Sequence, residues 1–170
     1  MNAFDKIICI LLASILMFLF PLFYLAQKQD VINQVYVESK TVEFVNDIKN
    51  HGYITANMYE RYLDNLEDTG NLYDIEMVHS HTIVNPEYDE DSGAFLDDYY
   101  TYQESKYQDD ILKEIFEESG TYYLRQGDYI SIKVYNKTET FAGRMLRIIG
   151  VNQKTQILVT YGGIIRDENY

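Results

Sequence analysis

The chain has 170 residues, a formal net charge of −13, one cysteine and no tryptophan. Acidic surfaces repel phosphate groups, so this composition excludes nucleic acid as a partner and argues against binding to anionic lipid headgroups. The only cysteine, Cys9, lies in an apolar segment, so no disulfide braces the rest of the chain.

The first 26 residues contain an apolar run that is long enough to cross a membrane. No charged side chain occurs from Ile7 to Ala26, and a helix of that length spans about 30 Å, the thickness of the hydrocarbon core. A cleaved secretory signal is the alternative, but Tyr24 lies where signal cleavage needs a small residue. We predict a single-pass anchor over residues 1–26 in the cell membrane.

The orientation of this anchor has a weak charge signal. Asp5 and Lys6 precede the run and Lys28 follows it, so neither flank has a strong positive excess. The remainder of the chain is acidic, rich in tyrosine and free of cysteine, which favours a C-terminal domain on the extracellular side.

Residues 27–50 contain no proline or glycine, so we predict that the helix continues as an amphipathic stalk. Four valines fall within an arc of about 80° when residues are placed at about 100° intervals: Val31, Val35, Val42 and Val45. Glu38 lies in the same stripe. The stripe packs either on the chain's own domain or on neighbouring subunits, and we take these five residues and Asp5 as candidates for subunit packing.

Residues 51–170 are expected to form one α+β head with helices and an antiparallel sheet. His51-Gly52 ends the stalk, and a helix with Asn57 and Glu60 as a capping box follows over residues 54–68. Alternation in residues 72–84 predicts a strand that buries Tyr73, Ile75 and Met77.

Residues 85–110 carry nine acidic side chains, one lysine and no periodic apolar face, which predicts a solvated loop. Asp89, Asp91 and Gly93 faintly resemble a calcium-binding loop, although Tyr100 stands where the bidentate glutamate belongs. Calcium binding therefore stays a minor alternative for this segment.

The C-terminal third predicts two helices and two strands. Apolar residues at helical spacing indicate helices over residues 107–119 and 138–149. Alternation of polar and apolar residues over residues 127–136 predicts a strand that buries Ile130, Ile132 and Val134. The last strand, residues 156–165, contains Gly162-Gly163, which could mark a bulge or a tight bend.

Few residues suit catalysis. His79 and His81 have the i, i+2 spacing of two metal ligands on a strand, but no cysteine or further ligand stands near them, so we interpret them as surface or edge histidines. His51, at a helix end, is expected to contact exposed carbonyl groups. Because no catalytic motif accompanies these histidines, we predict no enzymatic activity, no cofactor and no metal.

The overall plan resembles that of type IV pilin-like proteins, in which an apolar N-terminal helix continues into a stalk and a small α+β head. Three stretches are similar to membrane-anchored proteins of tight-adherence (Flp) pilus loci in Gram-positive bacteria: FVNDIKNHGYITANMYERYLDNLEDTGNLYDIEMVH, LRQGDYISIKV and YGGIIRDE. The resemblance implies a minor pilin-like subunit or an assembly factor, with the lipid bilayer and other pilin-like or pilus-assembly proteins as partners.

The sequence departs from the pilin pattern at its beginning. Pilin precursors are cut after a glycine just before the apolar helix, whereas no glycine precedes Gly52 here, which favours the assembly factor. Asp5 could neutralise the terminal amine of a neighbouring subunit, or it could lie in the headgroup region beside Lys6. A membrane-tethered ligand-binding or sensor domain is the alternative function.

Overall fold

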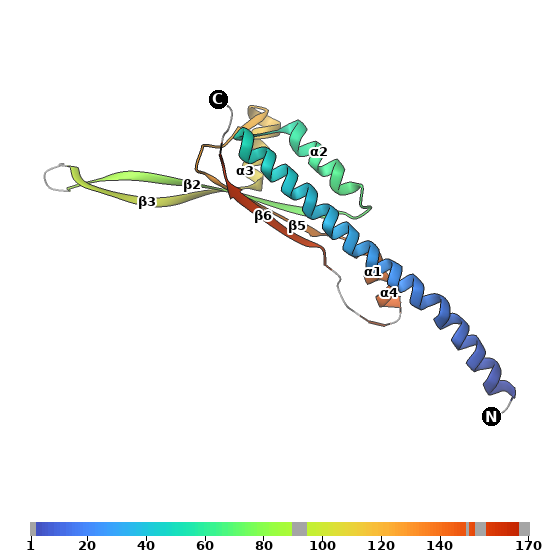
Figure 1. Ribbon diagram of the computed structural model, residues 1–170. Coiled ribbons are helices and arrows are strands. Elements are labelled where there is room, and N and C mark those ends of the chain that lie inside the picture. Colours follow the sequence, from blue (N-terminus) through green and yellow to red (C-terminus); the bar gives the residue numbers. More distant parts are fainter. Residues whose placement is uncertain (1–2, 90–94, 149, 152–155, 167–170) are drawn as a thin grey trace.

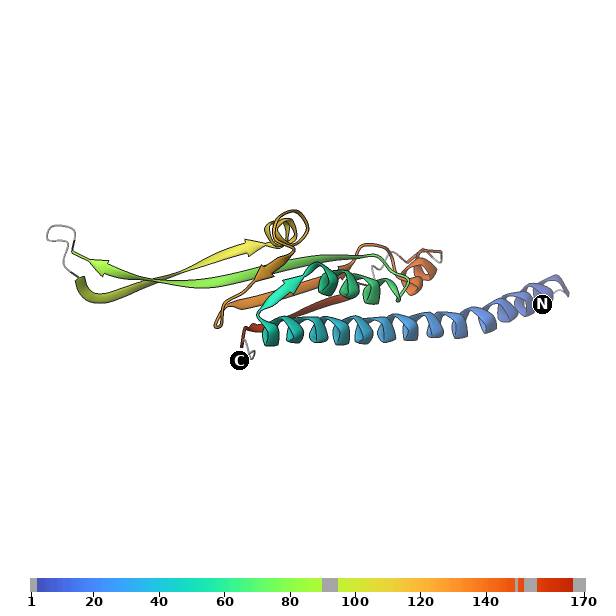
Figure 2. The same ribbon diagram turned by 90° about the horizontal axis from the view of Figure 1, so that it is seen from above.

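The computed structural model describes residues 3–89, 95–148, 150–151 and 156–166. It has the expected α+β composition: a long apolar N-terminal helix, then a small domain of helices and antiparallel sheets. The molecule is elongated, with the start of the helix at one end and a β-hairpin at the other (Figures 1 and 2).

Helix α1 runs without interruption from Ala3 to His51. It ends as the sequence predicts, because Gly52 adopts a φ of 72° and its N–H donates to the carbonyl of Ile48 over 2.8 Å. The Nδ1–H of His51 donates to the carbonyl of Asp47 over 2.7 Å, in agreement with the expected contact.

The second half of α1 packs on the domain through a different face from the expected one. Its buried residues recur every three or four positions: Asp30, Asn33, Val37, Thr41, Phe44, Val45 and Ile48. The valine stripe that the sequence indicated lies roughly a third of a turn away, and only Val45 belongs to both faces. Three of the buried residues are polar, and this is why counting apolar side chains alone selects the wrong face.

The sheet that α1 crosses has four antiparallel strands in the order β3-β2-β5-β6. These strands are Tyr73–Tyr88 (β2), Phe95–Tyr107 (β3), Tyr129–Asn136 (β5) and Leu158–Ile164 (β6), and a two-stranded sheet joins Tyr53–Thr55 (β1) to Thr121–Tyr123 (β4). The expected burial of Ile130, Ile132 and Val134 on β5 is confirmed. Apolar side chains from α1 and from this face of the sheet form the core, where Ile48, Met77 and Ile132 are almost fully buried.

The acidic segment is not the loop that its composition predicts. β2 continues to Tyr88, and β3 begins at Phe95 and pairs with it in register from Val78↔Tyr107 to Pro86↔Tyr99, so residues 85–88 and 95–107 are strands. Tyrosines and β-branched residues favour strands, and charged side chains are tolerated because both faces of this hairpin reach solvent. Asp91 and Gly93 of the possible calcium loop lie outside the described residues.

Helix α2, Ala56–Glu67, lies beside α1 and is capped differently from the expected capping box. Its N-cap is Thr55, whose hydroxyl accepts from the N–H of Met58 over 3.2 Å, two residues before the predicted cap. Tyr62 of α2 stacks on Phe44 of α1 with ring centroids 4.4 Å apart, and its hydroxyl lies 2.8 Å from the Thr41 hydroxyl. Burial raises the pKa of Tyr62, so this contact joins two neutral hydroxyl groups.

The remaining helices follow the expected order. The predicted helix 107–119 appears as α3, Gln108–Lys113, which continues into a π-helical turn, Glu114–Glu118 (η1). The predicted helix 138–149 is confirmed as α4, Phe141–Ile148.

The two glycines of β6 have a different role from the bulge or bend considered above. The pairing of β6 with β5 keeps one register through Gly162 and Gly163. A Cβ atom at Gly162 would lie 2.6 Å from the backbone oxygen of Ile130, and one at Gly163 would lie 2.9 Å from the side chain of Lys49. The glycines therefore allow close approach of β5 and of α1 to this strand.

Candidate functional site

A cluster of polar side chains lies on the core side of β2, between Met77 and Ile83 of that face. His79 and His81 follow Ile75 and Met77 at every second position, so the strand presents all four to one side. The pairing of His79 with Ile130 places the beginning of β5 alongside, and the turn before β5 supplies Asp128. Gly127 permits this turn through a φ of 93°.

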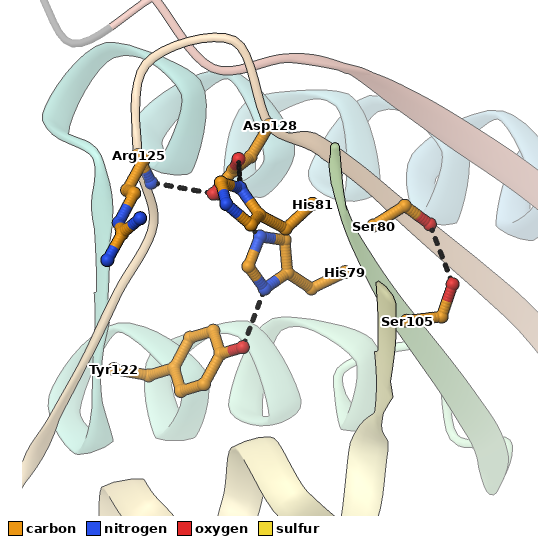
Figure 3. Close-up of polar contacts among 7 residues, drawn as sticks. All are labelled: His79, Ser80, His81, Ser105, Tyr122, Arg125 and Asp128. Atoms are coloured by element: carbon orange, nitrogen blue, oxygen red, sulfur yellow. Dashed lines mark hydrogen bonds and ion pairs between the residues drawn. The ribbon is translucent and has the colours of Figure 1, made fainter. Parts of the chain in front are cut away.

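The carboxylate of Asp128 contacts both histidines, whose side chains are drawn in Figure 3. One carboxylate oxygen accepts from His79 Nε2 over 2.8 Å and from the backbone N–H of Arg125 over 2.8 Å, and the other accepts from His81 Nδ1. His79 is 7% exposed and Asp128 is 3% exposed. The prediction of two surface or edge histidines is therefore wrong for His79, because the turn and β4 cover it, whereas His81 is half-buried.

The cluster extends from Asp128 through His79 to Tyr122 of β4, whose hydroxyl lies 2.6 Å from His79 Nδ1. The tautomer of His79 with its proton on Nε2 satisfies both contacts: Nε2–H donates to the carboxylate and Nδ1 accepts from the tyrosine hydroxyl. Burial alone would raise the pKa of Asp128, but hydrogen bonds from His81, the Arg125 N–H and His79 outweigh it and hold that pKa below its usual range. The carboxylate is therefore ionised and fully hydrogen-bonded.

Tyr122, His79 and Asp128 form a continuous row of polar groups, in the order of a hydroxyl, an imidazole and a carboxylate. Burial raises the pKa of the Tyr122 hydroxyl. Within the described part of the chain, no group of three or more His, Cys, Asp or Glu side chains is arranged to hold a metal ion. The cluster instead ties β2, β4 and the turn at residues 125–128 together.

A hollow with a volume of about 390 Å³ opens beside this cluster. Its lining includes His81, Glu104, Lys106, Tyr123 and Arg125. Two cationic side chains and a half-buried imidazole could together contact a small anionic group. This hollow is one place where the head could accept a ligand, and its lining also includes the acidic Glu104 and Asp128.

The residues expected to pack against other subunits are spread along α1 and differ in exposure. Asp5 lies exposed in the first turn, Val31 and Val35 are each 59% exposed, Glu38 is exposed, Val42 is half-buried and Val45 is buried in the core. The structure brings together Val31, Val35, Glu38 and Val42 on one side of α1, which we name the outer stripe. Val45 belongs to the core, and Asp5 is far from the stripe along the helix.

The second exposed feature is the β-hairpin arm, which comprises residues 81–88 and 95–104. These residues pair only with each other, since the pairing of β2 with β5 stops at Ser80. Eight residues of strand extend about 26 Å, and Figures 1 and 2 show the arm projecting away from the body. Exposed aromatic side chains on the arm include Tyr88, Phe95, Tyr99, Tyr100 and Tyr102.

Sequence reasoning missed Asp128 and Tyr122 as partners of the histidines. Each lies more than forty residues from His79, and no fixed spacing links them. One feature of the sequence could have indicated Asp128: Gly127-Asp128 is a turn signal immediately before β5, the strand that pairs with β2, which carries both histidines.

Comparison with known proteins does not assign this site. No protein family, curated protein or solved structure matches the chain.

Proposed function

We propose that this chain is a non-enzymatic, membrane-anchored surface protein that serves as a minor pilin-like subunit or assembly factor of a tight-adherence pilus. The observation that carries the proposal is the division of α1 into two halves. The first half is apolar and almost uncovered, and the second half packs against an antiparallel sheet. The resemblance described above supplies the pilus assignment.

The exposed first half supports a membrane anchor. α1 has the length and hydropathy needed to cross a bilayer, and the most apolar part of the helix has no buried residue. Phe18, for example, is 73% exposed. Burying one such side chain in an apolar environment is worth about 1.5–3 kcal/mol, so a lipid environment stabilises this segment strongly.

The outer stripe and the β-hairpin arm supply surfaces for other subunits. Val31 and Val35 begin only a few residues beyond the apolar run, where neighbouring anchored helices would lie parallel to α1. The arm points away from the apolar end (Figure 2), so it would reach proteins farther from the membrane. Two strands alone are marginally stable in water, which favours a bound partner for the arm.

A photo-crosslinking residue placed at Val35 in cells tests the contact along the stripe. The proposal predicts a light-dependent adduct between the tagged chain and another protein with an apolar N-terminal helix in the membrane fraction. Gln34 is the matched control, because it is exposed on the same helix and points about 100° away from Val35. Equal adducts from both positions, or none from Val35 in membranes that contain the chain, would contradict the proposal.

The hollow beside His81 favours a second candidate, a membrane-tethered ligand-binding or sensor domain. Lys106 and Arg125 line it, so phosphate is a suitable first probe. This function predicts that phosphate shifts the NMR signals of His81 in the intact chain and that Arg125→Gln weakens the shift. Unchanged signals at millimolar phosphate would remove anion binding from consideration.

A further inference from the structure

Helix α4 lies against the part of α1 that is expected to be in the membrane. At its beginning, Thr140 and Ala142 face the carboxylate of Asp30, which lies just after the apolar run. At its end, Met145 and Ile148 face Leu16, Leu19, Phe20 and Phe23, which lie inside that run. As the chain proceeds, α4 therefore runs from the edge of the apolar segment toward its middle.

The depth of this contact follows from the length of the helix. If the lipid ended before Leu16, only residues 7–15 would be immersed, and they span about 14 Å. The hydrocarbon core is about 30 Å thick, so this shorter stretch would cross only half of it. A bilayer that accommodates α1 must also surround the residues that α4 touches.

The side chains of α4 suit that position. Phe141, Met145 and Ile148 fall within an arc of about 60° on one side, and Ile148 is 83% exposed although it is apolar. Ala142 and Gly143 are buried on another side, where small residues permit close packing. Arg144 and Arg147 are exposed, and Arg147 extends back past the beginning of α4 to an ion pair with Glu139, 3.1 Å away, on the side nearer the headgroups.

An apolar hollow between the two helices supports the same conclusion. It has a volume of about 290 Å³, and Leu16, Leu19, Phe20, Phe23, Met145 and Ile148 line it. Water in such a space would find no polar partner, whereas part of an acyl chain would fit it.

We propose that α4 is a membrane-inserted helix that enters the leaflet nearer the head, with its Phe141–Met145–Ile148 face in lipid. This inference rests on the membrane anchor in the proposed function. It adds a second point of attachment, which fixes the tilt and rotation of the head relative to the bilayer. The occupant of the exposed α4 face is lipid, and not a second copy of the chain.

Depth-dependent fluorescence quenching tests this inference in the intact chain. Cys9→Ser removes the native thiol, and Ile148→Cys, Phe18→Cys or Thr101→Cys then supplies one site for an environment-sensitive dye. Each protein is reconstituted into phosphatidylcholine vesicles that contain spin-labelled lipid with the quencher either near the headgroup or near the chain end. All three positions are exposed, so the substitutions leave the core intact.

We expect both quenchers to reduce the emission of the dye at position 148, because Ile148 lies beside Leu16 and Leu19 inside the apolar run. The dye at position 18 should be quenched more by the chain-end label, and the dye at position 101 on the β-hairpin arm by neither. Quenching at position 18 without quenching at position 148 would contradict the membrane insertion of α4 and would leave the membrane anchor of the proposed function supported. Absence of quenching at 18 overturns the anchor itself. A dye at 148 that is shielded from water but not quenched by lipid indicates a protein neighbour and also overturns the inference.

Discussion

Replacing Asp128 with asparagine tests the assignment of the histidine cluster as the tie between β2, β4 and the preceding turn. Its carboxylate accepts hydrogen bonds from His79, His81 and the Arg125 N–H, and it is almost fully buried. A hydrogen bond to a charged group contributes about 1.5–3 kcal/mol and one to a neutral group about 0.5–1.5 kcal/mol. With three such bonds weakened by about 1 kcal/mol each, Asp128→Asn should lower the free energy of unfolding by about 3 kcal/mol at neutral pH.

The effect has a defined pH dependence. The folded-state pKa of Asp128 is lowered from its ordinary value of 3.8, so the charged carboxylate stabilises the fold above that value. The stabilisation is lost as the pH falls from 3.8 through the folded pKa. Asparagine does not titrate, so the stability difference between the two proteins should shrink as the pH falls below 3.8.

Urea unfolding of the full chain in detergent micelles, followed by the near-UV circular dichroism of its 17 tyrosines, measures this difference. A change of about 3 kcal/mol corresponds to a midpoint shift of about 1–2 M urea. Asp64→Asn is the control, because Asp64 is exposed on α2 and its substitution should leave the midpoint unchanged. An Asp128→Asn midpoint equal to that of the parent chain, or a difference that does not shrink in acid, would refute the reasoning.

Two further pairs of substitutions test the fold. Gly162→Ala should lower the free energy of unfolding by about 1–3 kcal/mol, because the new Cβ meets the fixed backbone oxygen of Ile130. Gly163→Ala should lower it by under about 0.5 kcal/mol, because the Lys49 side chain can move aside. Equal losses in urea unfolding would contradict this difference. Thr55→Ala should lower the free energy of unfolding by about 1 kcal/mol through loss of the α2 cap, and Asn57→Ala should leave it nearly unchanged. A larger loss for Asn57→Ala than for Thr55→Ala in thermal unfolding would contradict the Thr55 cap and favour the capping box that the sequence predicted.

Local patterns in the sequence were sufficient for most elements. Alternation identified the buried face of β5, and Gly52 marked the end of α1. These features depend on neighbouring residues, so a single sequence contains them.

Features that depend on distant residues could not be obtained in this way. The buried face of α1 includes Asn33 and Thr41, which a count of apolar residues omits. The hydroxyl of the distant Tyr62 accommodates Thr41. The acidic hairpin forms because its two strands satisfy each other's backbone, a pairing that composition does not report. Asp128 joins His79 only through the pairing of β2 with β5.

Cell fractionation tests the central claim, a membrane-anchored protein that takes part in pilus assembly, most directly. A C-terminally tagged chain, expressed from its own locus, is compared by blot in sheared surface filaments, carbonate-washed membranes and the soluble fraction, together with Val35→Glu and its control Gln34→Glu. The account predicts recovery with filaments or washed membranes, and loss of piliation with Val35→Glu but not with Gln34→Glu. Recovery in the soluble fraction, or normal piliation with Val35→Glu, would contradict it.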